Sequence, residues 1–219
     1  ASDDSGAPYN PTDTFAMPAD KVILYAIWTP KSYTVSFDPN GGSAAVPATL
    51  SVTYTQAYGT LASTSQPGYT FAGWWTTPSG VGLQVSDATL MNTASDHTLY
   101  ARWTPNTYTV TFDPEAGDTP SPTTRLVTFA APYGSLSTTS RAGWFFAGWW
   151  TGAGGTGSQV FETTAVTTPN DHVLYAKWSA VPTYTAAYNG KGNTGGTGGN
   201  DSTKYATSTH VTQTDCGTP

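Results

Sequence analysis

The sequence has few charged residues, and this shortage excludes several classes of partner. Asp, Glu, Lys and Arg together make up 10% of the 219 residues, against about a quarter in ordinary soluble proteins. The eight Lys and Arg residues stand singly, and the net charge is −6. Nucleic-acid phosphates and anionic membrane surfaces both require clustered cations. The composition therefore argues against binding to nucleic acids and to anionic membranes.

Cysteine and long hydrophobic runs are also scarce. Cys216 is the single cysteine, so no disulfide can form within the chain. No His or basic cluster surrounds Cys216 in the sequence, and we therefore interpret it as an incidental thiol rather than a nucleophile. No apolar run approaches the roughly 20 residues that a membrane-spanning helix needs. We expect that this segment does not insert into a membrane.

Helical patterning is missing as well. No convincing stretch keeps apolar residues at the i, i+3, i+4 and i+7 positions of an amphipathic helix. Aromatic residues make up 13% of the chain, and 23 Gly and 16 Pro residues punctuate short β-branched stretches. Such a composition is typical of short strands joined by tight turns. The sequence predicts a mainly β protein with short strands and at most a short helix.

Comparison of the sequence with itself reveals two copies of one unit, 75 residues apart. The segment YTVSFDP, which begins at Tyr33, returns as YTVTFDP at Tyr108. The letters FAGWWT at residues 71–76 recur at residues 146–151. Repetition at a fixed period is typical of proteins built from arrays of small structural units.

The repeat divides the chain into four parts. LYAIW, which ends at Trp28, matches the closing strand LYAKW of the later copy, and YTAAYNG, which begins at Tyr184, matches the opening strand. We expect the chain to be a segment of a longer array. The predicted parts are the C-terminal part of a preceding repeat (1–32), two complete repeats (33–107 and 108–182), and the N-terminal part of a following repeat or a Gly-rich linker (183–219).

The strands of each copy alternate between hydrophobic and polar residues. In YTVTF, Tyr108, Val110 and Phe112 lie on one face of the predicted strand, and the two threonines lie on the other. The closing strand at residues 174–178 alternates in the same way. This pattern predicts sheets with one buried face.

The adjacent tryptophans of FAGWWT cannot both enter one core, because successive side chains of a strand point to opposite faces. Strict alternation places Trp75 on the face of Phe71. A β-bulge at Gly73 would bring Trp74 to that face instead, since Gly inside a strand often marks a bulge.

Two Asp-His pairs, Asp96-His97 and Asp171-His172, precede the closing strands. A metal site would need further ligands at a recurring spacing, and none accompanies these pairs. We interpret the aspartates as turn residues that cap backbone amides. We also interpret the isolated His210 as a structural residue rather than a metal ligand.

No pair of carboxylates suited to catalysis recurs between the copies. Glu115 and Glu162 each occur in one copy, so no carboxylate pair repeats for acid-base work. The sequence has no nucleophile elbow, and no phosphate-binding glycine motif precedes a helix. The Gly-rich stretch at 192–200 indicates a loop or linker. We expect a protein that is not an enzyme, with no catalytic residue, no metal site and no cofactor.

The ordered motifs YTVTFDP, YGSL, FAGWWT and DHTLYARW resemble the Listeria/Bacteroides repeat, also called the internalin B-type B repeat. The resemblance covers residues 33–182 almost continuously. It implies small β-grasp-like domains, arranged in tandem as beads on a string, in secreted or cell-envelope proteins of bacteria with adhesin-like architectures. Two positions depart from the pattern: Trp144 stands where Tyr is usual, and DPEAG at Asp113–Gly117 replaces the usual NGG turn.

The resemblance also places Trp74 and Trp149 in the core, and this favours the bulge at Gly73. Trp75 and Trp150 then lie on the outer face. There they are candidates for stacking on a sugar or for entering the pocket of a partner protein. The alternative is that they cover a neighbouring strand or repeat, because a small domain needs every large ring to bury enough surface.

From these patterns we predict a non-enzymatic repeat region of a bacterial cell-surface, adhesin-like protein that acts as a stalk or spacer and offers surfaces for interaction. Its expected location is extracellular, at the cell envelope. The expected partners are neighbouring repeats and an unidentified host or cell-surface protein or glycan. One alternative is a glycan- or host-protein-binding module that uses Trp75 and Trp150, and another is an accessory module of a secreted enzyme.

Overall fold

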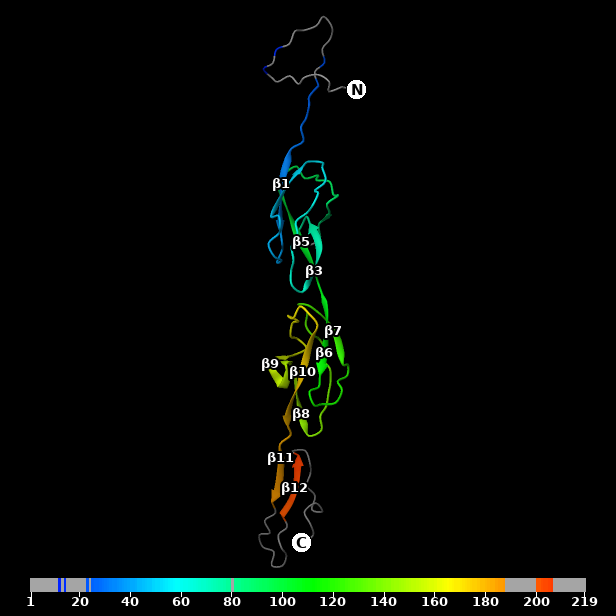
Figure 1. The fold of residues 1–219 in the computed structure, drawn as a ribbon, viewed down its shortest axis with the longest axis vertical. Helices are drawn as coiled ribbons and strands as arrows, with labels where there is room; N and C mark the ends of the chain where they lie inside the picture. The colour runs from blue at the N-terminus through cyan, green and yellow to red at the C-terminus, as the bar shows by residue number, and fades with distance from the viewer. Residues whose placement is uncertain are drawn as a thin grey trace, which may run out of the picture. The chain divides into compact units, whose positions relative to one another are not determined.

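The computed structural model describes residues 12, 14, 23, 25–79, 81–187 and 200–206. The chain divides into two compact units (Figure 1). The first holds most of the first repeat, and the second holds Gly41–Ser43, Ser65–Ala72 and the chain from Trp103 onward. The predictions for Cys216, His210 and residues 192–199 lie outside the described residues.

The first repeat forms a five-stranded sheet in the order β2-β1-β5-β3-β4. Its central pair is parallel, with Phe37 of β1 opposite Leu99 of β5, whereas β2 pairs antiparallel with β1. The strands are β1 (Ser32–Asp38), β2 (Thr49–Thr53), β3 (Tyr69–Trp75), β4 (Gln84–Val85) and β5 (His97–Pro105). A mixed sheet with its first and last strands side by side and parallel agrees with the expected β-grasp-like unit.

The second repeat forms a sheet of the same order, β7-β6-β10-β8-β9. Phe112 of β6 lies opposite Leu174 of β10 in its parallel central pair. The strands are β6 (Thr107–Asp113), β7 (Thr124–Thr128), β8 (Trp144–Gly152), β9 (Thr156–Val160) and β10 (His172–Ala180), and the three-residue 3-10 turn η1 (Ala153–Gly155) joins β8 to β9. It is the one helical element among the described residues, so the prediction of a mainly β protein with at most a short helix is confirmed.

The segments that flank the two complete repeats behave differently from each other. Residues 183–187 form β11 (Thr183–Ala187), which pairs antiparallel with β12 (Asn200–Ala206). In contrast, residues 25–28 are irregular and Trp28 is 87% exposed. The assignment of both flanking segments to partial repeats stays a prediction. The closing strands β5 and β10 each lie between two strands of their own repeat, and residues 25–28 have no such pairing among the described strands.

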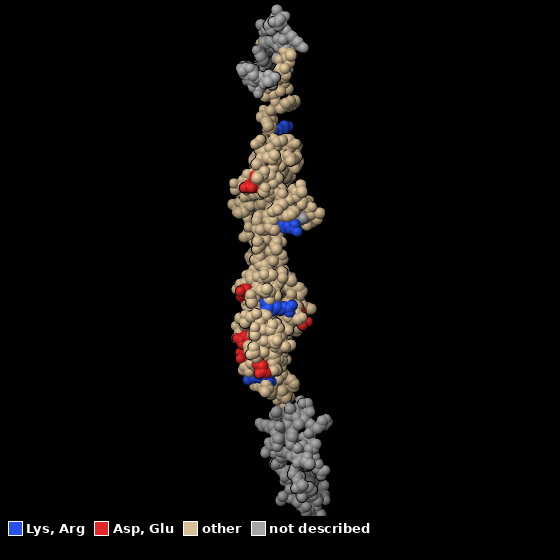
Figure 2. Space-filling model, turned by 90° about the vertical axis from the view of Figure 1, so that its right-hand side faces the viewer, with Lys and Arg blue, Asp and Glu red and all other residues tan. Residues whose placement is uncertain are grey.

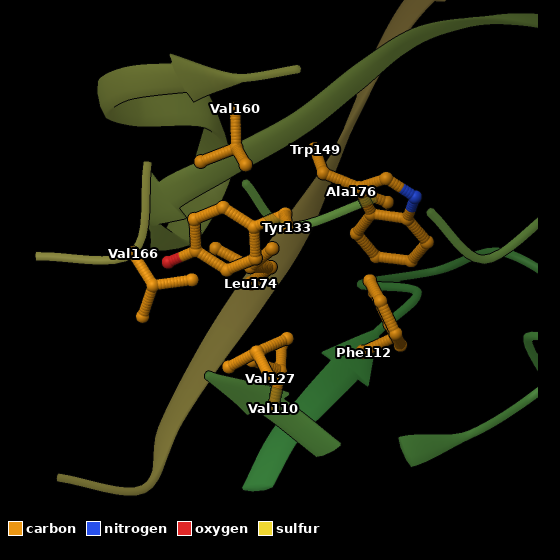
Figure 3. Close-up of a cluster of buried hydrophobic side chains, with 9 residues drawn as sticks. All are labelled: Val110, Phe112, Val127, Tyr133, Trp149, Val160, Val166, Leu174 and Ala176. Carbon is orange, nitrogen blue, oxygen red and sulfur yellow. The ribbon is translucent and has the colours of Figure 1, made fainter. Parts of the chain in front are cut away.

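The core of the second repeat lies on one face of its sheet (Figure 3). Alternation along β6 and β10 turns Val110, Phe112, Leu174 and Ala176 inward. Trp149 from β8 closes the cluster and contacts Phe112 with ring centroids 4.8 Å apart. The nine buried members are Val110, Phe112, Val127, Tyr133, Trp149, Val160, Val166, Leu174 and Ala176.

Each of these nine core positions has a buried counterpart 75 residues earlier. The counterparts are Val35, Phe37, Val52, Tyr58, Trp74, Val85, Met91, Leu99 and Ala101. Met91 in place of Val166 is the single change of residue type among the nine pairs. The two repeats therefore bury the same side chains in the same order.

A β-bulge sets the direction of the Trp pair. Across β8 and β10, Trp149 lies opposite Ala176 but Phe146 lies opposite Trp178, so the register shifts between these pairs. Gly148 takes a φ of 107° inside this bulge, and Gly73 takes 100° at the equivalent position. Trp149 is 2% exposed. The predicted bulge is confirmed in the second repeat, and the predicted burial of the first Trp of each pair is confirmed in both, since Trp74 is 1% exposed.

Candidate functional site

The second tryptophan of each pair lies on the outer face of its sheet and carries a cation above its ring. Trp75 and Trp150 are half-buried. The guanidinium carbon of Arg102 lies 4.7 Å from the Trp75 ring centroid, and the ammonium nitrogen of Lys177 lies 4.0 Å from that of Trp150. Such cation-π contacts are attractive because the ring face is electron-rich.

The covering cations follow from strand alternation. Arg102 and Lys177 each come directly after a buried alanine of the closing strand, so their side chains point to the outer face. From the sequence alone we predict no role for these two residues. A basic residue at the fourth position of both LYARW and LYAKW, on the face opposite the core, is the sequence feature that could have identified them.

The cations limit what the outer tryptophans can do. A ring with one face under a cation offers only its other face and its edges to a sugar or a partner. The indole nitrogen of Trp150 is buried and has no hydrogen-bond partner in the part of the chain that the structure describes. The proposal that Trp75 and Trp150 bind a ligand remains a hypothesis.

The histidines of the Asp-His pairs connect the core to a loop. In the second repeat the Tyr133 hydroxyl and His172 Nε2 lie 2.7 Å apart, and His172 Nδ1 lies 3.0 Å from the Asn170 carbonyl oxygen. A carbonyl oxygen only accepts, so Nδ1 carries a proton, and in the neutral form of the imidazole Nε2 accepts from the tyrosine. Tyr58 and His97 repeat the 2.7 Å contact.

The aspartates of these pairs bind amides of the opening strands. Asp171 Oδ1 accepts from the Thr109 amide at 2.7 Å, and Asp96 Oδ1 accepts from the Thr34 amide at the same distance. The predicted capping of backbone amides is confirmed. The amide, however, lies 62 residues away on the parallel neighbour rather than in the local turn. Both aspartates thus pin the closing strand to the opening strand.

Burial raises the pKa of the Tyr58 and Tyr133 hydroxyls above their usual value, because the charged phenolate loses its hydration there. Both tyrosines are therefore neutral donors at physiological pH. Tyr133, His172 and Asp171 link the core and the opening strand to the closing strand through hydrogen bonds.

Titratable groups do not gather into a reactive or metal-binding centre in the described part of the chain. No group of three or more His, Cys, Asp or Glu residues lies close enough there to hold a metal ion. In the view of Figure 2, residues other than Asp, Glu, Lys and Arg cover most of each compact unit, and the acidic and basic residues form small spots. Among the described residues, no helix has the length and hydropathy to span a bilayer.

Known proteins share this repeat. The Listeria-Bacteroides repeat domain matches residues 33–102 and again residues 108–177. A protein of Evansella cellulosilytica named "Putative Gly-rich membrane protein" is 32% identical over 199 residues, which cover 87% of this chain and 21% of that protein. A second protein of the same organism, named "Putative membrane protein", is 29% identical over 78% of this chain and 24% of its own length.

An internalin is similar as well. Internalin H of Listeria monocytogenes is 38% identical over 93 residues, which cover 42% of this chain and 16% of the internalin. The chain thus spans about a quarter or less of the relatives that it matches. Two matches of the repeat domain cover more than half of the chain, at the 75-residue spacing of its two sheets. The chain belongs to the Listeria-Bacteroides repeat family.

Proposed function

We propose that the chain is a non-enzymatic repeat region of an adhesin-like protein on the bacterial cell surface, where it acts as a stalk or spacer. The observation that carries this proposal is the repetition of all nine core positions in two sheets of the same strand order. Each repeat buries its own aromatic cluster. Such units can be added in series, and each addition lengthens the array.

The relatives support a location at the cell envelope. Two of them carry the name of a membrane protein, and a third is an internalin. This chain corresponds to a minor part of each relative, so anchoring and partner binding belong to whole proteins of this kind. The low share of charged residues and the many Thr, Ser and Gly residues fit a surface that presents other domains.

A second candidate function is binding of a glycan or a protein through Trp75 and Trp150. The supporting observation is that both repeats keep the same indole-cation pair on the outer face. Copies that bind singly with low affinity would gain avidity in an array. The cation above each ring leaves less of the indole for a ligand, and we therefore favour the stalk.

The stalk proposal is tested by the dependence of reach on copy number. One, two and four copies of residues 108–182 are placed between a cell-wall anchor and an epitope tag, and the height of the tag above the cell surface is measured by super-resolution microscopy. We expect the height to grow in proportion to the number of copies, because each copy is a folded body.

The matched control is a Gly-Ser linker with the same number of residues, whose reach grows with about the square root of its length. Fourfold lengthening should therefore about double the height of the linker and roughly quadruple that of the array. A repeat series that follows the square-root growth of the linker would overturn the stalk proposal.

A further inference from the structure

A groove of about 320 Å³ opens on the second repeat. Two indoles, two cations and a carboxylate line it, supplied by Trp144, Trp178, Arg141, Lys177 and Glu115. Its volume lies at the lower end of the range of about 300–1,000 Å³ that is typical of small-molecule sites. Trp144 is 38% exposed, so part of its surface is open to solvent.

The groove gathers positions at which the two repeats differ. Glu115, Arg141 and Trp144 stand where the first repeat has Asn40, Gln66 and Tyr69. Glu115 lies 26 residues before Arg141 and 29 before Trp144, yet all three line one hollow. Three of the residues that line the groove therefore distinguish the second repeat from the first.

The difference between Asn40 and Glu115 changes the contacts of the alanine that lines the groove. In the first repeat the amide nitrogen of Asn40 donates to the carbonyl oxygen of Ala101 at 3.0 Å. In the second repeat the equivalent alanine, Ala176, lines the groove. Glu115 turns elsewhere, because its Oε1 accepts from the backbone amide of Gly154 at 2.7 Å. Asn40 thus makes a hydrogen bond to the closing strand of the first repeat, whereas Glu115 places a carboxylate at the groove of the second repeat.

Contacts within the repeat fix the indole rings of Trp178 and Trp144 without a ligand. The Trp178 indole nitrogen donates to the Pro114 carbonyl oxygen at 2.9 Å, and its ring packs on Phe146 at 5.4 Å between centroids. The guanidinium of Arg141 lies 4.1 Å from the centroid of Trp144 and covers one of its faces. Fixed rings lower the ordering cost of binding.

We propose that this groove binds a neutral saccharide. A sugar has apolar C–H faces that pack on indole rings, and its hydroxyls both donate and accept hydrogen bonds. Glu115 supplies acceptor oxygens, and Arg141 and Lys177 supply donors. The groove therefore offers a partner to each kind of group on the sugar.

Glu115 offsets one of the two cations that line the groove, so only a small net charge remains there to attract a charged ligand. The ammonium group of Lys177 also makes a cation-π contact with Trp150, which weakens its attraction for an anion in the groove. A neutral polyol has hydrogen bonds available to all three groups and meets no repulsion from any of them.

This site does not depend on the stalk role. The groove depends on residues particular to the second repeat, whereas the spacer proposal rests on features common to both. Saccharides from an animal cell surface and from a bacterial wall both have apolar C–H faces and hydroxyl groups that the groove could bind. The experiment therefore uses probes from both sources.

The test is saturation-transfer NMR and calorimetry on the intact chain. The probes are lactose and mannotriose for animal glycans and N,N′-diacetylchitobiose for wall polysaccharides, with 3′-sialyllactose as the anionic match to lactose. We expect at least one neutral probe to bind with a Kd in the millimolar range, at concentrations up to about 10 mM. We expect sialyllactose to bind more weakly than lactose.

The key variant restores the residues of the first repeat: Glu115→Asn, Arg141→Gln and Trp144→Tyr. These types occupy the same positions of the first sheet, and Asn40 and Glu115 share a positive φ, of 46° and 57°, so the fold should be retained, as checked by circular dichroism. We expect affinity to fall at least about tenfold. Phe145→Ala is the control, since Phe145 is exposed beside Trp144 and does not line the groove.

Four outcomes would overturn the proposal. One is that no neutral probe binds the unmodified chain in this range, and a second is that the triple variant binds as tightly as the unmodified chain. The third is that Phe145→Ala weakens binding to the same degree as the triple variant. The fourth is that sialyllactose binds more tightly than lactose.

Discussion

The hydroxyls of Tyr58 and Tyr133 each form a hydrogen bond with a histidine at the edge of a core. Burial raises their pKa in the folded state, whereas the unfolded value is about 10. The folded state thus favours the protonated hydroxyl. This contribution to stability is complete below pH of about 10 and is lost as the pH rises through the raised folded-state pKa.

We therefore expect the free energy of unfolding to fall above pH of about 10, with two tyrosines contributing. The measurement is urea denaturation from pH 7 to 11, compared with the variant Tyr58→Phe, Tyr133→Phe. The variant should lose about 1–3 kcal/mol per site at pH 7, because each histidine Nε2 loses its donor. Its alkaline decline should be shallower. An equally steep decline in the variant would assign the effect to other groups.

At the scale of a single element, β8 depends on Gly148. Its φ of 107° lies beyond the left-handed helical region that other residues tolerate. A Cβ at this position would lie 2.6 Å from Nε2 of Gln159, whose side chain donates to the Ala147 carbonyl oxygen at 3.1 Å. The glycine thereby allows Trp149 to turn into the core.

We expect Gly148→Ala to lower the free energy of unfolding by about 1–3 kcal/mol, because it strains the backbone and displaces Gln159. Gly154→Ala is the matched control. Gly154 also has a positive φ, of 67°, but no atom lies within 4 Å of its added Cβ, and a cost of about 1–2 kcal/mol is expected for that φ alone. Thermal denaturation and near-UV circular dichroism would measure both. An equal or smaller loss in Gly148→Ala would refute a special role for the bulge.

The sequence carries much of this element-level information. Alternation in YTVTF and LYAKW predicts the inward Val110, Phe112, Leu174 and Ala176, since a strand allows only two directions for a side chain. The bulge needed the added knowledge of a family pattern, because Gly73 alone leaves two directions open for the tryptophans. Local periodicity therefore predicts which strands form and which face they bury.

Other features depend on segments that meet only after folding. Tyr133 and Val166 enter the core from loops that have no periodic pattern. The contact between Tyr133 and His172 joins residues 39 positions apart, and the groove joins Glu115 to Trp144. No local rule relates such positions. A comparison of the two repeats supplies a partial signal, since the groove residues are among those that differ.

At the scale of the whole molecule, the chain contains two compact units with equivalent cores. Leu99 and Leu174 occupy matching positions and are fully buried. In a repeat protein, stability is approximately a sum over units and their nearest-neighbour terms. Damage to one core should therefore leave most of the stability of the other intact.

We expect Leu174→Ala to lower the stability of the second repeat by about 2–5 kcal/mol through the lost contacts and the remaining cavity. Hydrogen exchange followed by mass spectrometry would report this as faster exchange in β7 and β10, with β1 and β2 nearly unchanged. Leu99→Ala should give the reciprocal pattern and serves as the matched control. If either substitution accelerates exchange equally in both sheets, the repeats unfold as one cooperative body, and the additive stalk that we propose would have to be replaced by a single continuous domain.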